Sequence, residues 1–252
     1  MHKPYIGITG FITPQETAAI VGIMPWQSSR LLMAGVLVSS RTLRGLKGRW
    51  PNRYPDVTSI AAIFTNHHLA LNLVHYNTNE PHSLSQQLVE LTGLGGPYFH
   101  GYQLNIAWPP VTELSRYRSR FPEMKMVLQI NQKSLEMVDY SAQDLVDKLG
   151  QEYAGLVDYI LLDLSAGYGI PLDPQWAVEN LKVLQEANLG MGFGVAGGLS
   201  ASTLDRIAPL INDFPDLSID AESLLRDKDD CLDIDQAKDY IGKALRLFGN
   251  RG

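Results

Sequence analysis

The chain has a single cysteine, Cys231, among its 252 residues. One cysteine excludes an internal disulfide and any Cys-x-x-Cys site, and it is compatible with a reducing compartment. Long apolar runs are missing too, because no stretch approaches the roughly 18 residues of a membrane span. The opening residues, Met1 to Tyr5, lack the apolar segment of a signal peptide. We therefore expect a soluble cytoplasmic protein that does not insert into a membrane.

Basic residues are fewer than acidic ones: 21 Lys and Arg stand against 27 Asp and Glu, for a net charge of −6. This balance disfavours duplex nucleic acid as a partner but says little about small anions, which respond to local charge. No group of side chains has the spacing of a metal site, so we expect neither a metal nor another cofactor. The chain is long enough for a large core.

Short apolar segments alternate with helical patterns about every thirty residues, the size of one βα unit. Eight such units predict a (β/α)8 barrel, with an open doubly wound sheet as the alternative. No linker or change of composition interrupts the pattern, so we expect one domain over residues 1–252. The predicted strands are Tyr5 to Thr9, Leu31 to Val38, Leu69 to Asn77, Tyr98 to Trp108, Lys125 to Ile130, Asp158 to Asp163, Met191 to Ala196 and Leu217 to Ala221.

The stretch Gly190 to Ser200 reads as a strand, a glycine turn and the start of a helix. Gly197 and Gly198 have no Cβ, so a ligand can approach the backbone closely. We expect Ser200 or Ser202 to cap a helix that runs to Ile211. Free N–H groups at such a helix start suit a phosphate, although an ordinary strand-to-helix turn has the same pattern.

Barrel enzymes carry their active sites at the carboxyl ends of the strands, which selects several polar residues of this chain. Asp163 follows Tyr-Ile-Leu-Leu, and partial burial there would raise its pKa and suit a general acid or base. A structural aspartate bonded to backbone N–H groups is the alternative. His75 lies near the end of the third strand and is a candidate base. Asn105 and Asp220 lie near the ends of other strands and are candidate ligand contacts.

Residues Ser39 to Pro55 form a long segment with five basic residues and no acidic one. Long loops in compact domains are often functional, although a solvated basic loop is the simpler explanation. Trp50 and Tyr54 lie within it and would suit an interface, so the segment could instead close a homodimer.

The order of these segments resembles phosphoribosylanthranilate isomerase, a member of the ribulose-phosphate-binding barrels. The resemblance spans the chain, and its firmest parts are Leu161-Leu162-Asp163 and Ala196-Gly197-Gly198-Leu199. The other matching segments are Tyr5-Ile6-Gly7-Ile8-Thr9, Ser39-Ser40-Arg41, Tyr102-Gln103-Leu104-Asn105, Gly167 with Gly169 and Trp176, and Ile219-Asp220-Ala221-Glu222-Ser223.

The resemblance implies a role for each matching residue. Asp163 would be the general acid of an Amadori rearrangement, protonating the furanose oxygen as the sugar ring opens. Arg41 would pair with the carboxylate of the aromatic part of the ligand. The phosphate would be held by Gly197, Gly198 and Ser223, and Asp220 would line the pocket.

Two departures from the family pattern bear on activity. The general base of the family is a cysteine in the opening motif, and Ile6 stands at that position here. In the eighth-strand motif Leu224 replaces a glycine and Glu222 is an added carboxylate, which would weaken phosphate binding if it points inward.

We therefore expect an isomerase or lyase that acts on a small phosphorylated sugar-like ligand, with chemistry that differs from the standard reaction of the family. Asp163 would be its acid, and His75 the candidate base. The alternative is a barrel that binds a phosphorylated ligand without catalysis.

Overall fold

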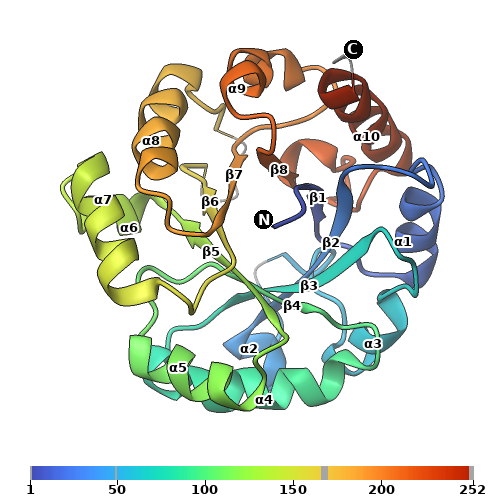
Figure 1. The fold of residues 1–252 in the computed structure, drawn as a ribbon. Coiled ribbons are helices and arrows are strands. Elements are labelled where there is room, and N and C mark those ends of the chain that lie inside the picture. The colour runs from blue at the N-terminus through green and yellow to red at the C-terminus, as the bar shows by residue number, and fades with distance from the viewer. Residues whose placement is uncertain (1, 49, 166–169, 250–252) are drawn as a thin grey trace.

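The strands of the chain close into a single parallel barrel in sequence order, from β1 to β8 and back to β1 (Figure 1). The computed structural model describes residues 2–48, 50–165 and 170–249. The predicted (β/α)8 barrel is therefore confirmed. The strands are β1 (Tyr5–Thr9), β2 (Leu31–Ser39), β3 (Ala70–Asn77), β4 (Gly101–Leu104), β5 (Lys125–Ile130), β6 (Tyr159–Leu162), β7 (Gly192–Ala196) and β8 (Ser218–Ala221).

Helices surround the barrel on its outer side, as Figure 1 shows. Their first turns follow the sequence signals: Thr13 caps α1 in a capping box with Glu16, and Asp173 caps α8 ahead of Pro174. The α-helices are α1 (Pro14–Val21), α2 (Ser40–Leu43), α3 (Ile60–Ile63), α4 (Leu84–Gly95), α5 (Val111–Arg120), α6 (Gln132–Glu136), α7 (Ala142–Lys148), α8 (Pro174–Glu186), α9 (Ala208–Asp213) and α10 (Ile234–Gly249). None of the described helices is both long and apolar enough to cross a bilayer.

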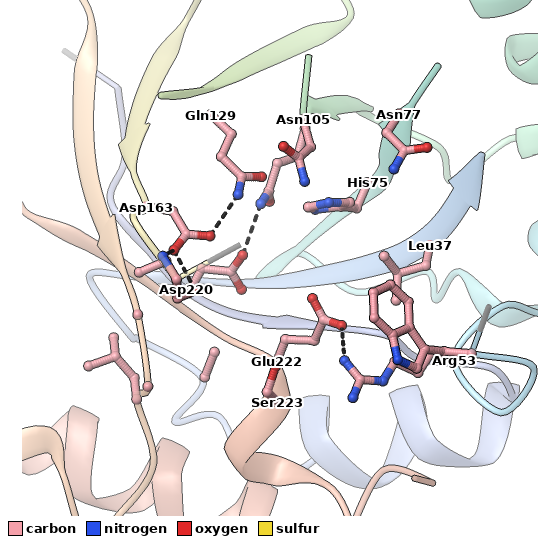
Figure 2. A pocket seen from close by; sticks show the side chains of 18 of the residues that line it. Leu37, Arg53, His75, Asn77, Asn105, Gln129, Asp163, Asp220, Glu222 and Ser223 are labelled. Atoms are coloured by element: carbon pink, nitrogen blue, oxygen red, sulfur yellow. Dashed lines mark hydrogen bonds and ion pairs between the residues drawn. The ribbon is translucent and has the colours of Figure 1, made fainter. Parts of the chain in front are cut away.

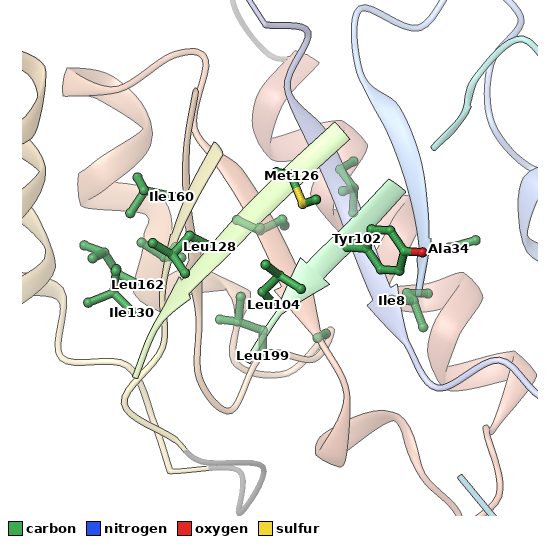
Figure 3. Packing of buried hydrophobic residues seen from close by; sticks show 14 of the residues in the cluster. Ile8, Ala34, Tyr102, Leu104, Met126, Leu128, Ile130, Ile160, Leu162 and Leu199 are labelled. Carbon is green, nitrogen blue, oxygen red and sulfur yellow. The ribbon is translucent and has the colours of Figure 1, made fainter. Parts of the chain in front are cut away.

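Each strand has one face toward the barrel interior and one toward the helices, because successive side chains point to opposite sides. In β1, Ile6 and Ile8 join the large apolar cluster between barrel and helices, part of which Figure 3 shows. Tyr5 points the other way, into a smaller cluster inside the barrel. Apolar side chains fill that interior: Met33, Leu71, Leu73, Val127, Tyr159, Leu161 and Ala196.

Two predicted elements differ from the structure. The fourth strand covers only Gly101–Leu104 rather than Tyr98 to Trp108. Its predicted start lies outside the ladder, since the Tyr98 carbonyl accepts a hydrogen bond from the Asn72 side chain at 2.8 Å. Its predicted end cannot continue a strand, because Trp108 has a φ of +48°.

The helix after β7 begins later than predicted. Ser200 lies in a turn, and the chain then forms a 3-10 turn over Leu204–Ile207 before the six-residue α9. The Ser200 N–H bonds to the Thr203 side chain at 2.8 Å, and Thr203 also donates to the Gly198 carbonyl at 2.7 Å. These bonds close a local turn, so no long helix starts beside Gly197 and Gly198.

Candidate active site at the barrel mouth

A cavity of about 170 Å³ lies at the carboxyl ends of the strands, where barrel enzymes have their active sites. Its floor is polar, although the barrel interior below it is apolar. Figure 2 shows the side chains that line it, and they come from strands all round the barrel. Every residue predicted for the site except Arg41 lines this cavity: His75, Asn105, Asp163, Gly197, Gly198, Asp220 and Ser223.

Asp163 follows β6 directly and is 7% exposed. Its Oδ1 accepts hydrogen bonds from the Ser165 N–H at 2.7 Å and the Ser165 hydroxyl at 2.6 Å. The other oxygen accepts one from Gln129 Nε2 at 2.7 Å. Burial raises the pKa of Asp163 above its usual value, although the two bonds from Ser165 act in the opposite direction. This carboxyl group is held in place and can keep a proton at higher pH than an ordinary aspartate.

Asp220 is an inward residue of β8 and is 5% exposed. Thr9 Oγ1 lies 3.1 and 3.2 Å from its two oxygens, and Gln103 Nε2 donates to Oδ2 at 3.0 Å. Burial raises the pKa of Asp220 to about 7, and the charges of Glu222 and Asp163 act in the same direction. The Asp220 carboxyl group therefore gains and loses its proton near neutral pH.

His75 is an inward residue near the end of β3 and is 7% exposed. Within the described residues its Nδ1 is buried and has no hydrogen-bond partner. Burial lowers the pKa of His75 to about 4, although the charge of Asp163 acts in the opposite direction. His75 is thus neutral at pH 7 and is a weaker base there than the carboxylate of Asp220.

The position that carries the family's cysteine does not face the cavity. Ile6 packs outward, whereas Gly7 faces inward at the pairing position of Asp220. A Cβ on Gly7 would lie 2.8 Å from Asp220 Oδ1, so a glycine here lets the carboxyl group lie against β1. The inward positions of β1 that carry a side chain are Tyr5 and Thr9, and Thr9 donates to Asp220.

The glycine pair after β7 forms one wall of the cavity. Gly197 and Gly198 have φ values of +126° and +53°, which L side chains rarely adopt. In the described part of the chain, neither glycine N–H donates a backbone hydrogen bond. Ser223 lines the same cavity from the loop after β8. The backbone of these two loops therefore converges on one rim, but without the long helix that the sequence predicted there.

The basic segment after β2 closes one side of the cavity. Trp50, Arg53 and Tyr54 line it, and Arg53 is only 8% exposed. Arg53 Nη1 donates to Glu222 at 2.8 Å, and its Nε and Nη2 donate to Asp230 at 2.9 and 2.7 Å. Two loops that are far apart in sequence, after β2 and after β8, are thereby joined across the mouth.

Arg41 lies elsewhere. It belongs to the four-residue helix α2, is exposed and does not line the cavity. Ser39 caps this helix by accepting from the Thr42 N–H at 3.2 Å. The cap turns the chain away from the barrel directly after β2, so Arg41 points outside the mouth.

Several lining residues were not among the predicted site residues. Gln103 and Gln129 are inward residues of β4 and β5 that hold the two aspartates. The alternation of strand side chains could have found them, because Gln129 lies two residues after the interior Val127 and Gln103 lies two residues before Asn105, itself predicted for the site. Arg53 and its bond to Glu222 could not have been found in this way, since 169 residues separate the partners. Gly167 and Gly169 of the predicted sixth unit lie outside the described residues.

Comparison with known proteins agrees with this architecture. No family model and no curated protein matches the sequence. Among solved structures, phosphoribosyl anthranilate isomerase from Thermus thermophilus matches with a TM-score of 0.67 at 12% identity, covering 96% of this chain and 99% of that one. TrpF from Jonesia denitrificans matches with a TM-score of 0.62 at 16% identity, covering 98% and 100%.

Barrels of other enzyme classes match as well. The catalytic domain of a chitinase from Pyrococcus furiosus has a TM-score of 0.58 at 11% identity, covering 100% of this chain and 98% of that one. At such identities the likeness concerns the backbone and not the reaction. The chain therefore has the (β/α)8 barrel fold of the phosphoribosylanthranilate isomerases.

Proposed function

We propose that the protein is an acid–base enzyme, an isomerase or lyase that acts on a small phosphorylated sugar-like ligand. The observation that carries the proposal is the pair Asp163 and Asp220. Both carboxyl groups are buried on the floor of one cavity, both have a raised pKa, and each is held by its own glutamine. Pairs of titratable groups in such a cleft are typical of catalytic sites.

The two carboxyl groups divide the proton transfers between them. Asp163 donates its proton to the ring oxygen as the carbon–oxygen bond of the sugar opens. Asp220, in its ionised form, accepts the proton from the carbon next to the new double bond. A pKa of about 7 makes this carboxylate a stronger base than an ordinary aspartate and leaves a large fraction of it ionised at neutral pH. Asp220 thus fills the role for which Ile6 is unsuited.

The phosphate of the ligand lies at the rim formed by Gly197, Gly198 and Ser223. Backbone N–H groups of a glycine turn can bind an anion without a helix, because they point into the same concave space. Support comes from the positive φ values of both glycines and from their place on the cavity wall.

Solvent exchange tests the proposal. We expect the protein to exchange the C2 hydrogen of aldose phosphates, such as ribose 5-phosphate and glucose 6-phosphate, with deuterium from D2O, followed by NMR. Asp163→Asn and Asp220→Asn should each lower the rate by about 10²- to 10⁴-fold. Asp216→Asn, at an exposed position on the opposite end of the barrel, is the matched control and should leave the rate unchanged.

Thermal unfolding of each variant shows that a loss of exchange is not a loss of folding. Binding of the sugar phosphates without any exchange would contradict catalysis and favour the non-catalytic alternative. Exchange that survives both aspartate substitutions would contradict the assignment of the pair.

A further inference from the structure

The charges around the cavity point to the chemical nature of the ligand's reacting end. Three carboxyl groups line it, those of Asp163, Asp220 and Glu222. Figure 2 shows Glu222 extending from the β8 loop into the space below His75, on the same side as Asp220. Within the described residues, Arg53 is the one Lys or Arg side chain that lines the cavity.

Arg53 offsets only part of this negative charge. Its Nε and Nη2 already donate to Asp230, and its Nη1 donates to Glu222. A single guanidinium is thus shared by two carboxylates. Its Nε and Nη2 form the two-pronged contact with Asp230 that arginine prefers with a carboxylate, so this edge is not available to a ligand. A carboxylate on a ligand would meet three carboxyl groups, and the one Lys or Arg of the described residues that lines the cavity already has its donors engaged. Arg226, which donates to the Thr9 and Gly10 carbonyls, does not line the cavity.

Unused acceptors provide an independent observation. Gln103 Oε1, Gln129 Oε1 and His75 Nδ1 are buried polar atoms without a partner in the described structure. Their side chains are at least nine-tenths buried and belong to the cavity lining. The amide nitrogens of both glutamines are already committed to Asp220 and Asp163, so their oxygens are fixed as acceptors. Buried acceptors without donors are costly, and a ligand that brings N–H or O–H groups would satisfy them.

We propose that the reacting end of the ligand carries an amino group and hydroxyl groups and no carboxylate, as in an amino sugar phosphate. Glu222 is the counter-ion of the amino group, and Arg53 holds Glu222 in place. The placement of Arg41 outside the cavity agrees with this, because among the described arginines only Arg53 lines the cavity, and its donors are engaged by Asp230 and Glu222. The inference rests on the proposed function, since it assigns the substrate class of the same site.

Three compounds that share a phosphate and differ at the other end test the inference. They are glucosamine 6-phosphate, glucose 6-phosphate and 6-phosphogluconate, with dissociation constants measured by calorimetry at pH 7. We expect the amino sugar to bind at least about tenfold more tightly than the carboxylate, with the neutral sugar between them, because like charges at close range disfavour binding.

Glu222→Gln should remove most of the preference for the amine, so that the affinity for glucosamine 6-phosphate falls relative to the affinity for glucose 6-phosphate. Asp230→Asn is the matched control: it also removes one acceptor of Arg53, but Asp230 does not line the cavity. The Asp230→Asn variant should bind the three compounds in the same order of affinity as the wild type. A carboxylate compound that binds as tightly as the amine, or an order that survives Glu222→Gln, would overturn the inference.

Glucosamine without phosphate separates this inference from the proposed function. If it binds as tightly as glucosamine 6-phosphate, the phosphate site is wrong while the amine preference stands. If none of the three phosphorylated compounds binds, the proposed function fails and the inference fails with it.

Discussion

One aspartate lies at each end of β6, and the surroundings of the two shift their pKa values in opposite directions. Asp158 lies just before the strand at the bottom of the barrel, and Asp163 lies just after it at the mouth. Asp158 accepts from the Met126 N–H at 2.9 Å, pairs with Arg118 and has Lys125 at 3.3 Å. Burial opposes its ionisation, but these partners hold the pKa of Asp158 below its usual value.

No Lys or Arg among the described residues pairs with Asp163, and its pKa is raised instead of lowered. The difference teaches how one strand can hold a structural and a reactive carboxyl group. Where opposite charges and a backbone N–H surround a carboxylate, it stays ionised and joins neighbouring elements. Where burial is not compensated by a cation, the pKa of the carboxyl group rises, which suits it to proton transfer.

The largest expected effect comes from removing the bottom charge. Asp158→Ala leaves the half-buried Arg118 and the Met126 N–H without their acceptor. We expect it to lower the free energy of unfolding by about 3–5 kcal/mol, measured by urea titration. Asp163→Asn, the same kind of change at the other end, should cost much less, because no cation loses its partner. Equal losses at both ends would contradict the comparison.

Of these two substitutions, Asp163→Asn changes function more. Asp158→Asn keeps the shape of the side chain and should leave hydrogen exchange per folded molecule unchanged, whereas Asp163→Asn should abolish most of it. A loss of exchange in both would show that the bottom carboxylate also serves the reaction.

The next effect concerns pH. The folded protein keeps a proton on Asp220 up to about pH 7, whereas the unfolded chain releases it near pH 4. Between these values the folded state binds more protons, so this group's contribution to stability is present below about pH 4 and is lost as pH rises to 7. We expect the stability of the wild type relative to Asp220→Asn to fall by up to about 1.4 kcal/mol per pH unit in that window.

His75 should show the opposite sign and sharpens the test. Its pKa is about 4 in the folded protein and 6.5 in the unfolded chain, so its contribution is lost as pH falls from 6.5 to 4. The stability of the wild type relative to His75→Gln should therefore rise with pH in this range. If the stability of the wild type changed with pH in the same direction relative to both variants, burial at the mouth would not set both pKa values.

The smallest expected effect compares the two ends of β7. Gly190, before the strand, has a φ of +73° and free space around an added Cβ. Gly197, after it, has a φ of +126°, and a Cβ there would meet the Ile170 carbonyl at 3.2 Å. We expect Gly190→Ala to cost roughly 1 kcal/mol and Gly197→Ala somewhat more, measured by thermal unfolding. Gly197→Ala should also weaken phosphate binding, whereas Gly190→Ala should not.

Much of the fold follows from local pattern. Tyr5–Thr9 and Lys125–Ile130 are strands over the predicted residues, because apolar and β-branched side chains dominate them. The fourth strand was predicted too long, since at its start the Tyr98 carbonyl bonds to the Asn72 side chain and at its end Trp108 has a positive φ. The late start of α9 came from the Thr203 bonds, a turn whose residues also suit a helix start.

The sequence by itself determined the barrel, the ends of β1 and β5 and the place of Asp163 after β6, because hydrophobic periodicity and turn residues act over a few neighbouring positions. Only the tertiary structure decided that Ile6 faces outward and that Arg41 does not line the cavity. It also decided that Glu222 lines the cavity and accepts a hydrogen bond from Arg53. It also decided the pKa of Asp220, since burial and the fields of Glu222 and Asp163 come from groups that only folding brings together. Desolvation and charge depend on distance in space, which local sequence does not encode.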